Sequence, residues 1–387
     1  MSEVKPFFAT TLSGLEPLLA EEFESFGFTN VETTKRGVSF ETDYRGMVKA
    51  NMCSRFAIRI LLPWAEGRAK DPEGLYRFAK KLPWEQVLSS RGTLFINSSV
   101  SSDFFDHSHY AALKVKDAIA DRFREKTGKR PSVAKENPDL VIHLRIHESM
   151  VLISLDSSGD SLHRRGYRPP GAKAPLNETL AAAMIALSKW TPEKTLYIPM
   201  CGSGTLVMEA AMKAANLPSQ WFRPHFGFMK WKDYDRKVAE EVRLEIWQGR
   251  NTDKVKILAS DVDRDALRQT QSVVSKIAWE HDITIEDQNF FDLPEDQSGV
   301  TVILNPPYGE RMRPENIEQM YRDMGLKLKN DFANGDAWII TSNAEALNHV
   351  GFRPHAKHTL YNGKLECKYY GFGLYQGSRK DKPVTEE

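Results

Sequence analysis

The sequence is poor in cysteine. Its 387 residues include three cysteines, Cys53, Cys201 and Cys367, an odd number that lie far apart. A framework of disulfide bonds needs paired cysteines, and a zinc knuckle needs closely spaced ones. We therefore expect neither, and we predict no metal site.

The sequence also lacks an excess of charge of one sign. Lysine and arginine total 53 and aspartate and glutamate total 52, which gives a formal net charge of +1 at pH 7. Any surface that binds a nucleic acid must then be a local patch, offset by acidic residues elsewhere. On charge alone, a neutral soluble enzyme that acts on small molecules stays open.

Long apolar runs are absent as well. No segment approaches the roughly 20 apolar residues that span a membrane, and the first residues, MSEVKPFF, lack the apolar core of a signal peptide. We therefore expect a cytoplasmic protein without a membrane partner. Hydrophobic residues make up 41% of the chain, which suffices for the cores of the two or three domains expected at this length.

The motif Asn305-Pro306-Pro307-Tyr308 carries the most specific chemistry. The apolar run before it, 299–304, predicts a buried strand, and two prolines exclude both a ladder hydrogen bond and a helical start directly afterwards. The strand should end in a stiff, extended loop. There the Asn305 side-chain carbonyl and the Pro306 backbone carbonyl can point at one place beside the Tyr308 ring, which suits the exocyclic amine of a nucleobase.

Such an amine is a poor nucleophile, because its lone pair is delocalised into the ring. Accepting both N–H protons favours a pyramidal nitrogen whose lone pair points at an electrophile, and the same oxygens stabilise the positive charge that develops there. Stacking on the tyrosine would hold the base. The alternative is a turn that merely ends a strand; the buried strand before the motif and the tyrosine within it favour amine chemistry.

The tetrad resembles the Asn-Pro-Pro-Tyr signature of S-adenosylmethionine-dependent amino methyltransferases. Its extension, Gly309-Glu310-Arg311, is similar to that of RNA methyltransferases with a THUMP domain, particularly the bacterial large-subunit ribosomal RNA guanine-N2 methyltransferases. The resemblance implies S-adenosyl-L-methionine as cofactor and RNA as partner, with 23S ribosomal RNA first, transfer RNA second and DNA not expected. It implies that the catalytic residues are Asn305, Pro306, Pro307 and Tyr308, that Asn305 also lies against the cofactor, and that Arg311 contacts RNA unless it is an ordinary surface cation.

The N-terminal part predicts two small α+β units. Residues 1–65 follow the order strand-helix-strand-strand-helix-strand, which is the ferredoxin-like pattern. Residues 66–160 predict a second unit, whose position resembles that of the THUMP domain, an RNA-binding module. Its expected helices and strands are 72–81, 93–100, 108–126, 140–145 and 150–155.

A basic run follows at 161–175, the predicted linker to the C-terminal domain. Its cationic or titratable side chains beside an aromatic one could follow a phosphate backbone and stack a base: His163, Arg164, Arg165, Tyr167 and Arg168. A solvated linker would have the same composition. The run also matches the Leu-His-Arg-Arg-Gly-Tyr-Arg joint of the THUMP methyltransferases, and this resemblance favours RNA binding.

From residue 176 onward, long helices alternate with apolar strands, which predicts a doubly wound parallel sheet over 176–377. The expected fold class is α/β, with a Rossmann-like class I methyltransferase sheet preceded by ferredoxin-like and THUMP units. The polar tail 378–387 is expected to be disordered.

A glycine-rich turn joins the first strand of this sheet, 195–199, to the next helix. Such a turn lets the backbone approach a ligand closely, and the helix N-terminus offers free N–H groups. Two glycines alone are weak evidence, and no third glycine completes a dinucleotide fingerprint. The resemblance implies that the turn holds the methionine part of the cofactor, through Pro199, Cys201, Gly202, Ser203, Gly204 and Thr205.

Ile198 departs from the family pattern, which has an aspartate at this place. The missing carboxylate helps to position the cofactor, so either the affinity or the binding pose is in question. Glu178 on the preceding helix and Glu209 on the following one are the candidates to replace it.

Two later strand ends supply further candidates. Asp261 matches the family position that accepts hydrogen bonds from the ribose hydroxyls, although a capping aspartate is the alternative. Asp263 is expected to cap the helix that begins at Arg264. Members of the resembled family commonly have an aspartate, which contacts the adenine amino group, where this chain has Asn289; the amide oxygen of Asn289 can still accept. Phe290 would cover the adenine ring or belong to the core.

Other functions stay open beside a 23S ribosomal RNA guanine-N2 methyltransferase. A transfer RNA guanine-N2 methyltransferase would share the RNA-binding half. An N6-adenine or a protein-glutamine methyltransferase would share the tetrad. A non-catalytic RNA-binding or assembly factor would account for the lost acid at Ile198. The sequence does not indicate an oligomeric state.

Overall fold

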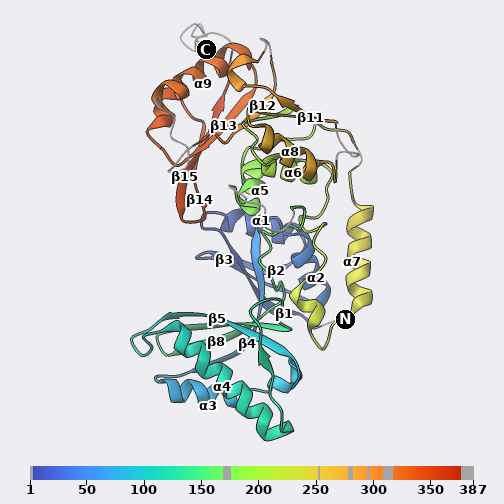
Figure 1. Cartoon of the computed structure of the whole chain (residues 1–387), viewed down its shortest axis with the longest axis vertical. Coiled ribbons are helices and arrows are strands. Elements are labelled where there is room, and N and C mark those ends of the chain that lie inside the picture. Colours follow the sequence, from blue (N-terminus) through green and yellow to red (C-terminus); the bar gives the residue numbers. More distant parts are fainter. Residues whose placement is uncertain are drawn as a thin grey trace, which may run out of the picture. The chain divides into compact units, whose positions relative to one another are not determined.

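The computed structural model describes residues 3–168, 176–251, 253–277, 282–293, 297–307 and 317–375 (Figure 1). The contacts divide the chain into two compact units. The first consists of Met1–Leu12, Glu16–Gly166 and Gln220–Gln248, and the second of Ser13–Leu15, Tyr167–Ser219 and Gly249–Glu387. Tyr308, Arg311 and the tail 378–387 lie outside the described residues.

The first unit begins with the predicted order of elements: β1 (Lys5–Thr11), α1 (Glu16–Ser25), β2 (Thr29–Thr34), β3 (Gly37–Thr42), α2 (Tyr44–Cys53) and β4 (Ala57–Arg68). Aromatic rings form its core, and the ring centroids of Phe23 and Phe28 lie 4.4 Å and 5.1 Å from that of Phe40. Asp43 accepts the Gly46 N–H at 2.9 Å and so caps α2.

The same unit continues with the elements predicted for the THUMP-like segment: α3 (Pro72–Lys81), the 3-10 helix η1 (Trp84–Gln86), β5 (Thr93–Ser101), α4 (Ser108–Thr127), β6 (Ser132–Val133), β7 (Leu140–His147) and β8 (Met150–Asp156). Local sequence explains the limits of both helices. Pro72 occupies the first turn of α3, and Asp71 caps it. Gly128 ends α4 with a φ of 67°, which favours glycine.

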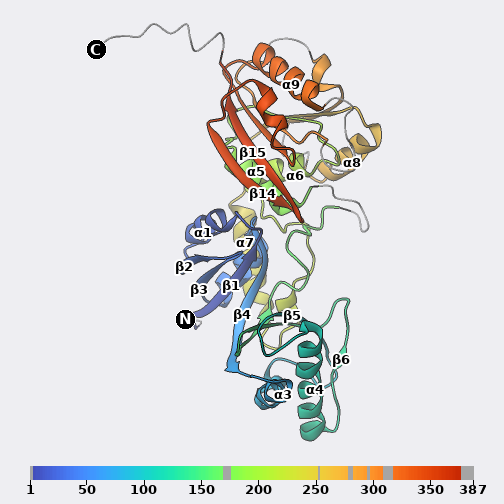
Figure 2. The ribbon, with the colours of Figure 1, turned by 90° about the vertical axis from the view of Figure 1, so that its left-hand side faces the viewer.

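A single eight-stranded sheet runs through both halves of the first unit, in the order β2-β3-β1-β4-β8-β7-β5-β6. The strand β4 pairs with β1 on one side and with β8 on the other, and Figure 2 shows it as one long strand. The predicted boundary between residues 65 and 66 therefore falls inside a strand that both halves share.

The aromatic-rich segment before residue 250 also belongs to the first unit. It contains the 3-10 helix η2 (Gly227–Lys230) and α7 (Arg236–Gln248), which packs against α2. Trp221 stacks on Trp247 at 5.0 Å, and Phe226 stacks on Phe228 at 5.4 Å. These rings are used for packing. The predicted C-terminal domain, 176–377, is thus interrupted by residues 220–248.

The second unit holds the predicted doubly wound sheet, which has seven strands. Its elements are α5 (Glu178–Leu187), β9 (Leu196–Pro199), α6 (Thr205–Ala214), β10 (Lys256–Asp261), α8 (Arg264–Val274), β11 (Asp282–Asp287), η3 (Phe290–Asp292), β12 (Thr301–Leu304), α9 (Ile317–Asp331), β13 (Asp336–Thr341), η4 (Ala346–Val350), β14 (Ala356–Asn362) and β15 (Leu365–Gly373). The last strand, β15, is antiparallel to both of its neighbours.

The strand order in this sheet is β11-β10-β9-β12-β13-β15-β14. Strands β10 and β12 are parallel to β9 and flank it, so the connections run in opposite directions from β9. Ligands of open α/β sheets bind outside the carboxyl ends of the strands at such a switch point. Among the described residues, no helix is long and apolar enough to cross a membrane.

Candidate active site

The glycine turn directly follows β9. Backbone φ is positive at Met200 (52°), Gly202 (55°) and Gly204 (78°), and Gly204 is the N-cap of α6. A side chain on Gly204 would lie 2.9 Å from atoms of Thr270, whereas one on Gly202 would meet no atom within 4 Å. Gly204 is therefore needed for close packing, while Gly202 leaves room for a ligand beside the backbone.

The other predicted turn residues lie around these glycines. Pro199 ends β9, and the Cys201 N–H donates to the Ser260 carbonyl at 3.0 Å. Burial raises the pKa of the Cys201 thiol to about 12, so the thiol is neutral and unreactive at pH 7. The Ser203 hydroxyl oxygen is buried, and within the described part of the chain it has no hydrogen-bond partner.

Asp261 lies at the carboxyl end of β10, beside the turn. Its carboxylate accepts the Gly202 N–H at 2.8 Å and the Asp263 N–H at 3.0 Å. Asp263 caps α8 by accepting from Asp265 and Ala266, as predicted. A carboxylate has about four lone-pair directions, so Asp261 can stabilise the turn and still accept from a ligand hydroxyl.

Asn305 and Pro306 follow the fully buried strand β12. Asn305 is half-buried and Pro306 is buried. The Asn305 side-chain oxygen Oδ1 is shielded from solvent and receives no hydrogen bond from any described residue. A buried acceptor without a donor is costly and usually has a functional reason. Because β9 and β12 are parallel neighbours, this acceptor and the glycine turn follow the same ends of adjacent strands.

The prediction for Phe290 is corrected by the structure. Its side chain is 2% exposed and packs with Tyr197, Phe332 and Phe291 in the core. A ring enclosed in this way cannot cover an adenine, so the core interpretation is the right one. Asn289 lies just before η3 and accepts the Phe291 N–H at 3.2 Å; its amide oxygen keeps a second lone pair for a ligand.

Glu178 and Glu209, the two candidates to replace the missing acid, both have partners in the structure. Ile198 is fully buried in β9. Glu178, in the first turn of α5, lies 3.3 Å from Nη1 of Arg168. Glu209, in α6, accepts the Tyr167 hydroxyl at 3.1 Å. Glu178 remains a cofactor-binding candidate together with its arginine, whereas Glu209 is 1% exposed and holds Tyr167.

The basic run does not form the RNA-binding surface that its composition suggested. Arg165 is 1% exposed, and its guanidinium donates to the backbone carbonyls of Leu162 at 2.9 Å and Arg55 at 2.5 Å. Tyr167 is fully buried. The predicted RNA contacts of Arg165 and Tyr167 are therefore wrong, because the fold uses both side chains to hold the chain in place.

The remaining residues of the run differ in exposure. Arg164 is exposed. His163 is half-buried, and burial, followed by the charges of Arg164 and Arg165, lowers its pKa to about 4. It is neutral at pH 7 and adds no positive charge for a phosphate. The Arg168 side chain is 10% exposed. Arg164 is thus the one predicted RNA-binding cation in the described part of the chain that solvent reaches freely.

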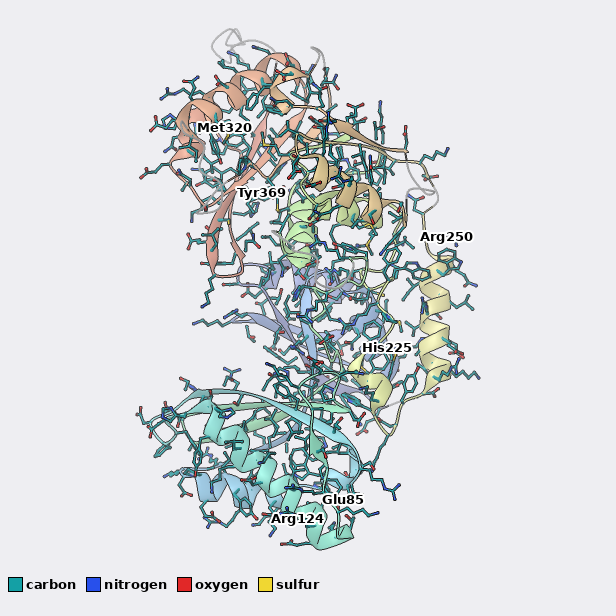
Figure 3. The ribbon with its side chains drawn as sticks, viewed as in Figure 1. Glu85, Arg124, His225, Arg250, Met320 and Tyr369 are labelled. Atoms are coloured by element: carbon teal, nitrogen blue, oxygen red, sulfur yellow. The ribbon has the colours of Figure 1, made fainter. Side chains whose placement is uncertain are left out.

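The first unit contains a cationic hollow that was not among the sites predicted from the sequence. It lies between α3 and α4 and has a volume of about 320 Å³, with a lining of Arg77, Lys80, Lys81, Arg122, Glu125 and Lys126. Glu85 accepts from Arg122 at 2.8 Å and also pairs with Lys126; it is labelled in Figure 3, beside α4. The helical spacing of Arg122 and Lys126, and of Arg77 and Lys81, was the available signal.

A mostly parallel sheet of this strand order, with a glycine turn after its first strand and Asn-Pro-Pro after its fourth, defines a class I methyltransferase domain. Comparison with protein families agrees. Residues 165–371 match the family described as "RMKL-like, methyltransferase domain", residues 69–156 match the THUMP domain, and residues 6–61 match the RlmL ferredoxin-like domain. The chain belongs to this RMKL-like methyltransferase family.

Individual relatives show the same arrangement. The chain is 38% identical, over 95% of its length, to the ribosomal RNA large subunit methyltransferase K/L of Syntrophotalea carbinolica, but it spans only 53% of that protein. It is 36% identical to the "Putative RNA methyltransferase slr0064" of Synechocystis sp., over 96% of this chain and 97% of that protein. The chain thus spans about half the length of one relative and nearly all of the other.

A solved structure is also similar along nearly the whole chain. It is that of "SMU.472, a putative methyltransferase complexed with SAH", which has a TM-score of 0.85 and 25% sequence identity. The match covers 98% of this chain and 100% of that one. The similarity therefore includes both units.

Proposed function

We propose that this protein transfers a methyl group from S-adenosyl-L-methionine to an exocyclic amine of a base in RNA, and that the target is guanine N2 of 23S ribosomal RNA. The observation that carries the proposal is the Asn305 side-chain oxygen, which is buried without a donor in the described part of the chain. It follows the strand next to the glycine turn. An amine N–H is the donor that this acceptor lacks.

The residues around the turn fit the cofactor. Gly202 leaves open space beside its backbone, and the buried Ser203 hydroxyl has no partner among the described residues. We assign the amino-acid end of the cofactor to the turn from Pro199 to Thr205, the ribose to Asp261, and the adenine amino group to Asn289. The bound cofactor would supply an electrophilic methyl group on a sulfonium.

The chemistry assigned to the chain is positioning and charge stabilisation. Asn305 Oδ1 and the Pro306 carbonyl accept the two amine protons, which directs the nitrogen lone pair away from the ring plane. The same oxygens stabilise positive charge on the nitrogen as the new bond forms. Tyr308 is assigned to stacking on the base. Most of the rate then comes from holding the reacting atoms in line.

For the RNA, the proposal rests on the names of the relatives and on charge. The K/L relative is named for large-subunit ribosomal RNA, and slr0064 for RNA. In this chain, the cationic hollow and the exposed Arg164 are the surfaces assigned to the phosphate backbone. Such a substrate places the activity in the cytoplasm. A transfer RNA guanine is the second choice and adenine N6 the third.

The proposal is tested by transfer of labelled methyl groups to unmodified 23S ribosomal RNA, transfer RNA and DNA, followed by nucleoside analysis. N2-methylguanine in ribosomal RNA alone is expected. Asn305→Ala should lower the rate about 10²- to 10³-fold, because one stabilising acceptor is lost. Its affinity for S-adenosylhomocysteine should change less than about threefold, because the acceptor acts on the transition state.

Asn343→Ala is the matched control. Asn343 follows β13, the strand next to β12, and its side-chain oxygen accepts the Ala346 N–H at 3.2 Å. Its loss should leave methyl transfer nearly unchanged. Label in transfer RNA or on adenine would keep the role of Asn305 and replace the substrate. Absence of both cofactor binding and methyl transfer would reject the enzyme and favour a non-catalytic RNA-binding factor.

A further inference from the structure

Arg168 is unusual for a residue in a basic run, because its charge is buried. Its side chain is 10% exposed, and its guanidinium lies over the Tyr167 ring, 5.7 Å from the centroid. The Nε atom is shielded from solvent and donates to no described residue. A buried guanidinium with an unused donor is costly unless a partner arrives. From this position it cannot follow an RNA backbone on the surface.

Two contacts fix this guanidinium beside the glycine turn. Its Nη1 atom lies 3.3 Å from Oε1 of Glu178, which is itself only 6% exposed. Its Nη2 atom donates to the hydroxyl of Thr205, the first residue of α6. The pair therefore places one positive and one negative charge at the N-terminus of a ten-residue helix.

The same place offers further groups for an anion. The first N–H groups of a helix have no intrahelical acceptor, and the helix dipole favours negative charge there. The Ser203 hydroxyl, one residue before the N-cap, is buried and lacks a partner within the described residues. The edge of Arg168 formed by Nε and Nη2 suits the two oxygens of a carboxylate.

We propose that Arg168 and Glu178 together bind the amino-acid end of the cofactor, with Arg168 holding the α-carboxylate and Glu178 the α-ammonium group. A buried pair of opposite charges matches a zwitterion, since each ligand charge meets one protein charge. This inference rests on the proposed function. Under this inference, Arg168 binds the cofactor and not RNA. Glu178 on α5 supplies the carboxylate that is missing at Ile198.

The test measures binding of three probes by titration calorimetry, independently of activity. S-adenosylhomocysteine has both charged groups, decarboxylated S-adenosylhomocysteine keeps only the amine, and 5′-methylthioadenosine has neither. The variant Arg168→Gln/Glu178→Gln removes both protein charges, so neither is left buried and unpaired. Its affinity for S-adenosylhomocysteine should fall about 10- to 100-fold, the range of charge-assisted hydrogen bonds. Its affinity for 5′-methylthioadenosine should stay the same.

The single variants separate the two roles. Arg168→Gln should weaken S-adenosylhomocysteine and leave the decarboxylated probe unchanged, because that probe has no carboxylate to lose. Glu178→Gln should weaken both amine-containing probes. Equal weakening of all three probes would show that the pair only maintains the fold of the turn, and unchanged affinity for S-adenosylhomocysteine would show that the pair lies away from the ligand. Either result overturns the inference.

The matched control is the exposed pair Arg322 and Glu318 on α9, whose nitrogen and oxygen atoms are 3.2 Å apart. Arg322→Gln/Glu318→Gln removes the same charges and should change no affinity. Failure of the proposed function is distinguishable: the unsubstituted protein would then bind neither S-adenosylhomocysteine nor S-adenosylmethionine. If it binds them and the Arg168 and Glu178 variants bind equally well, only this inference fails.

Discussion

The basic run and the strand ends of the second unit both carry polar side chains suited to binding or catalysis. The two segments differ in whether the fold supplies hydrogen-bond partners for those side chains. In the basic run, the Arg165 guanidinium is enclosed and donates to the carbonyls of Leu162 and Arg55. At the strand ends of the second unit, the Asn305 oxygen and the Ser203 hydroxyl are equally shielded but have no partner among the described residues. Both segments look functional in the sequence.

The comparison teaches that burial alone does not separate structural from functional polar groups. A buried donor or acceptor that the fold satisfies contributes to stability, and its removal leaves its partners unpaired. One that the fold leaves unsatisfied reduces stability and is retained for a ligand. Stability should therefore depend on the basic run, and ligand binding on the strand ends.

The largest expected effect on stability comes from Arg165→Met. The backbone carbonyls of Ser54, Leu162 and Arg55 would lose a charged donor in a buried place. We expect the free energy of unfolding to fall by about 2–4 kcal/mol. Urea unfolding measures this change. Binding of S-adenosylhomocysteine to the folded variant should be unchanged. A stable variant with lost RNA affinity would instead return Arg165 to the RNA-binding residues.

Arg164→Met is the matched control, because Arg164 is the exposed neighbour. Its free energy of unfolding should change by less than about 0.5 kcal/mol. If Arg164 contacts a phosphate, RNA affinity should weaken equally for all sequences. The slope of log affinity against log salt concentration should then fall by about 1. An unchanged slope would remove Arg164 from the proposed surface.

Gly202 and Gly204 allow the same comparison of stability with ligand binding within a single loop. Gly204→Ala forces a side chain to within 2.9 Å of Thr270 at a φ of 78°, so we expect a loss of about 2–3 kcal/mol in the free energy of unfolding. Gly202→Ala meets no atom within 4 Å. It should cost about 1 kcal/mol through its backbone conformation alone.

Affinity should follow the reverse order in these variants. The Gly202 methyl group would occupy the space assigned to the cofactor, and we expect S-adenosylhomocysteine to bind at least about tenfold more weakly. Calorimetric titration checks this. Tight binding by Gly202→Ala would place the cofactor elsewhere, whatever the change in stability.

The smallest expected effect concerns pH. Burial and then Arg164 and Arg165 lower the pKa of His163 to about 4, against 6.5 for an ordinary histidine. Between these values the unfolded chain binds the proton and the folded chain does not, so stability decreases as pH falls from 6.5 to 4. His163→Gln should remove about 1–3 kcal/mol of this decrease, given the partial exposure of the ring.

The measurement is urea unfolding at several pH values between 7 and 4. His147→Gln replaces an exposed histidine in the same unit and should leave the slope unaltered. An unaltered slope in His163→Gln would mean that the pKa of this ring is the same in the folded and unfolded chains. That result would contradict the depressed pKa.

Much of the fold could be predicted because local sequence decides it. Asp71 and Pro72 set the start of the helix that ends at Lys81, and the predicted and observed limits agree. The strand before Asn305 was recognised by its continuous apolar run, and all four of its residues are buried. Asp263 caps its helix, as expected from the residue type alone.

Pairing between distant segments is what the sequence left open. The continuity of β4 through residues 65 and 66 depends on its partners β1 and β8, which lie on opposite sides of it. The assignment of residues 220–248 to the first unit depends on contacts with α2, more than 160 residues earlier. Periodicity reports one face of one segment and not the identity of its partner.

The sequence by itself determined the kind of chemistry that we propose, because Asn305, Pro306 and the glycine turn each specify a local backbone and a functional group. The tertiary structure decided which polar groups remain available. The side chains of Arg165 and Phe290 are buried in the packed interior. The Asn305 side-chain oxygen remains without a donor among the described residues. Composition cannot show this difference, because satisfaction of a buried polar group depends on the atoms that the fold brings within about 3 Å of it.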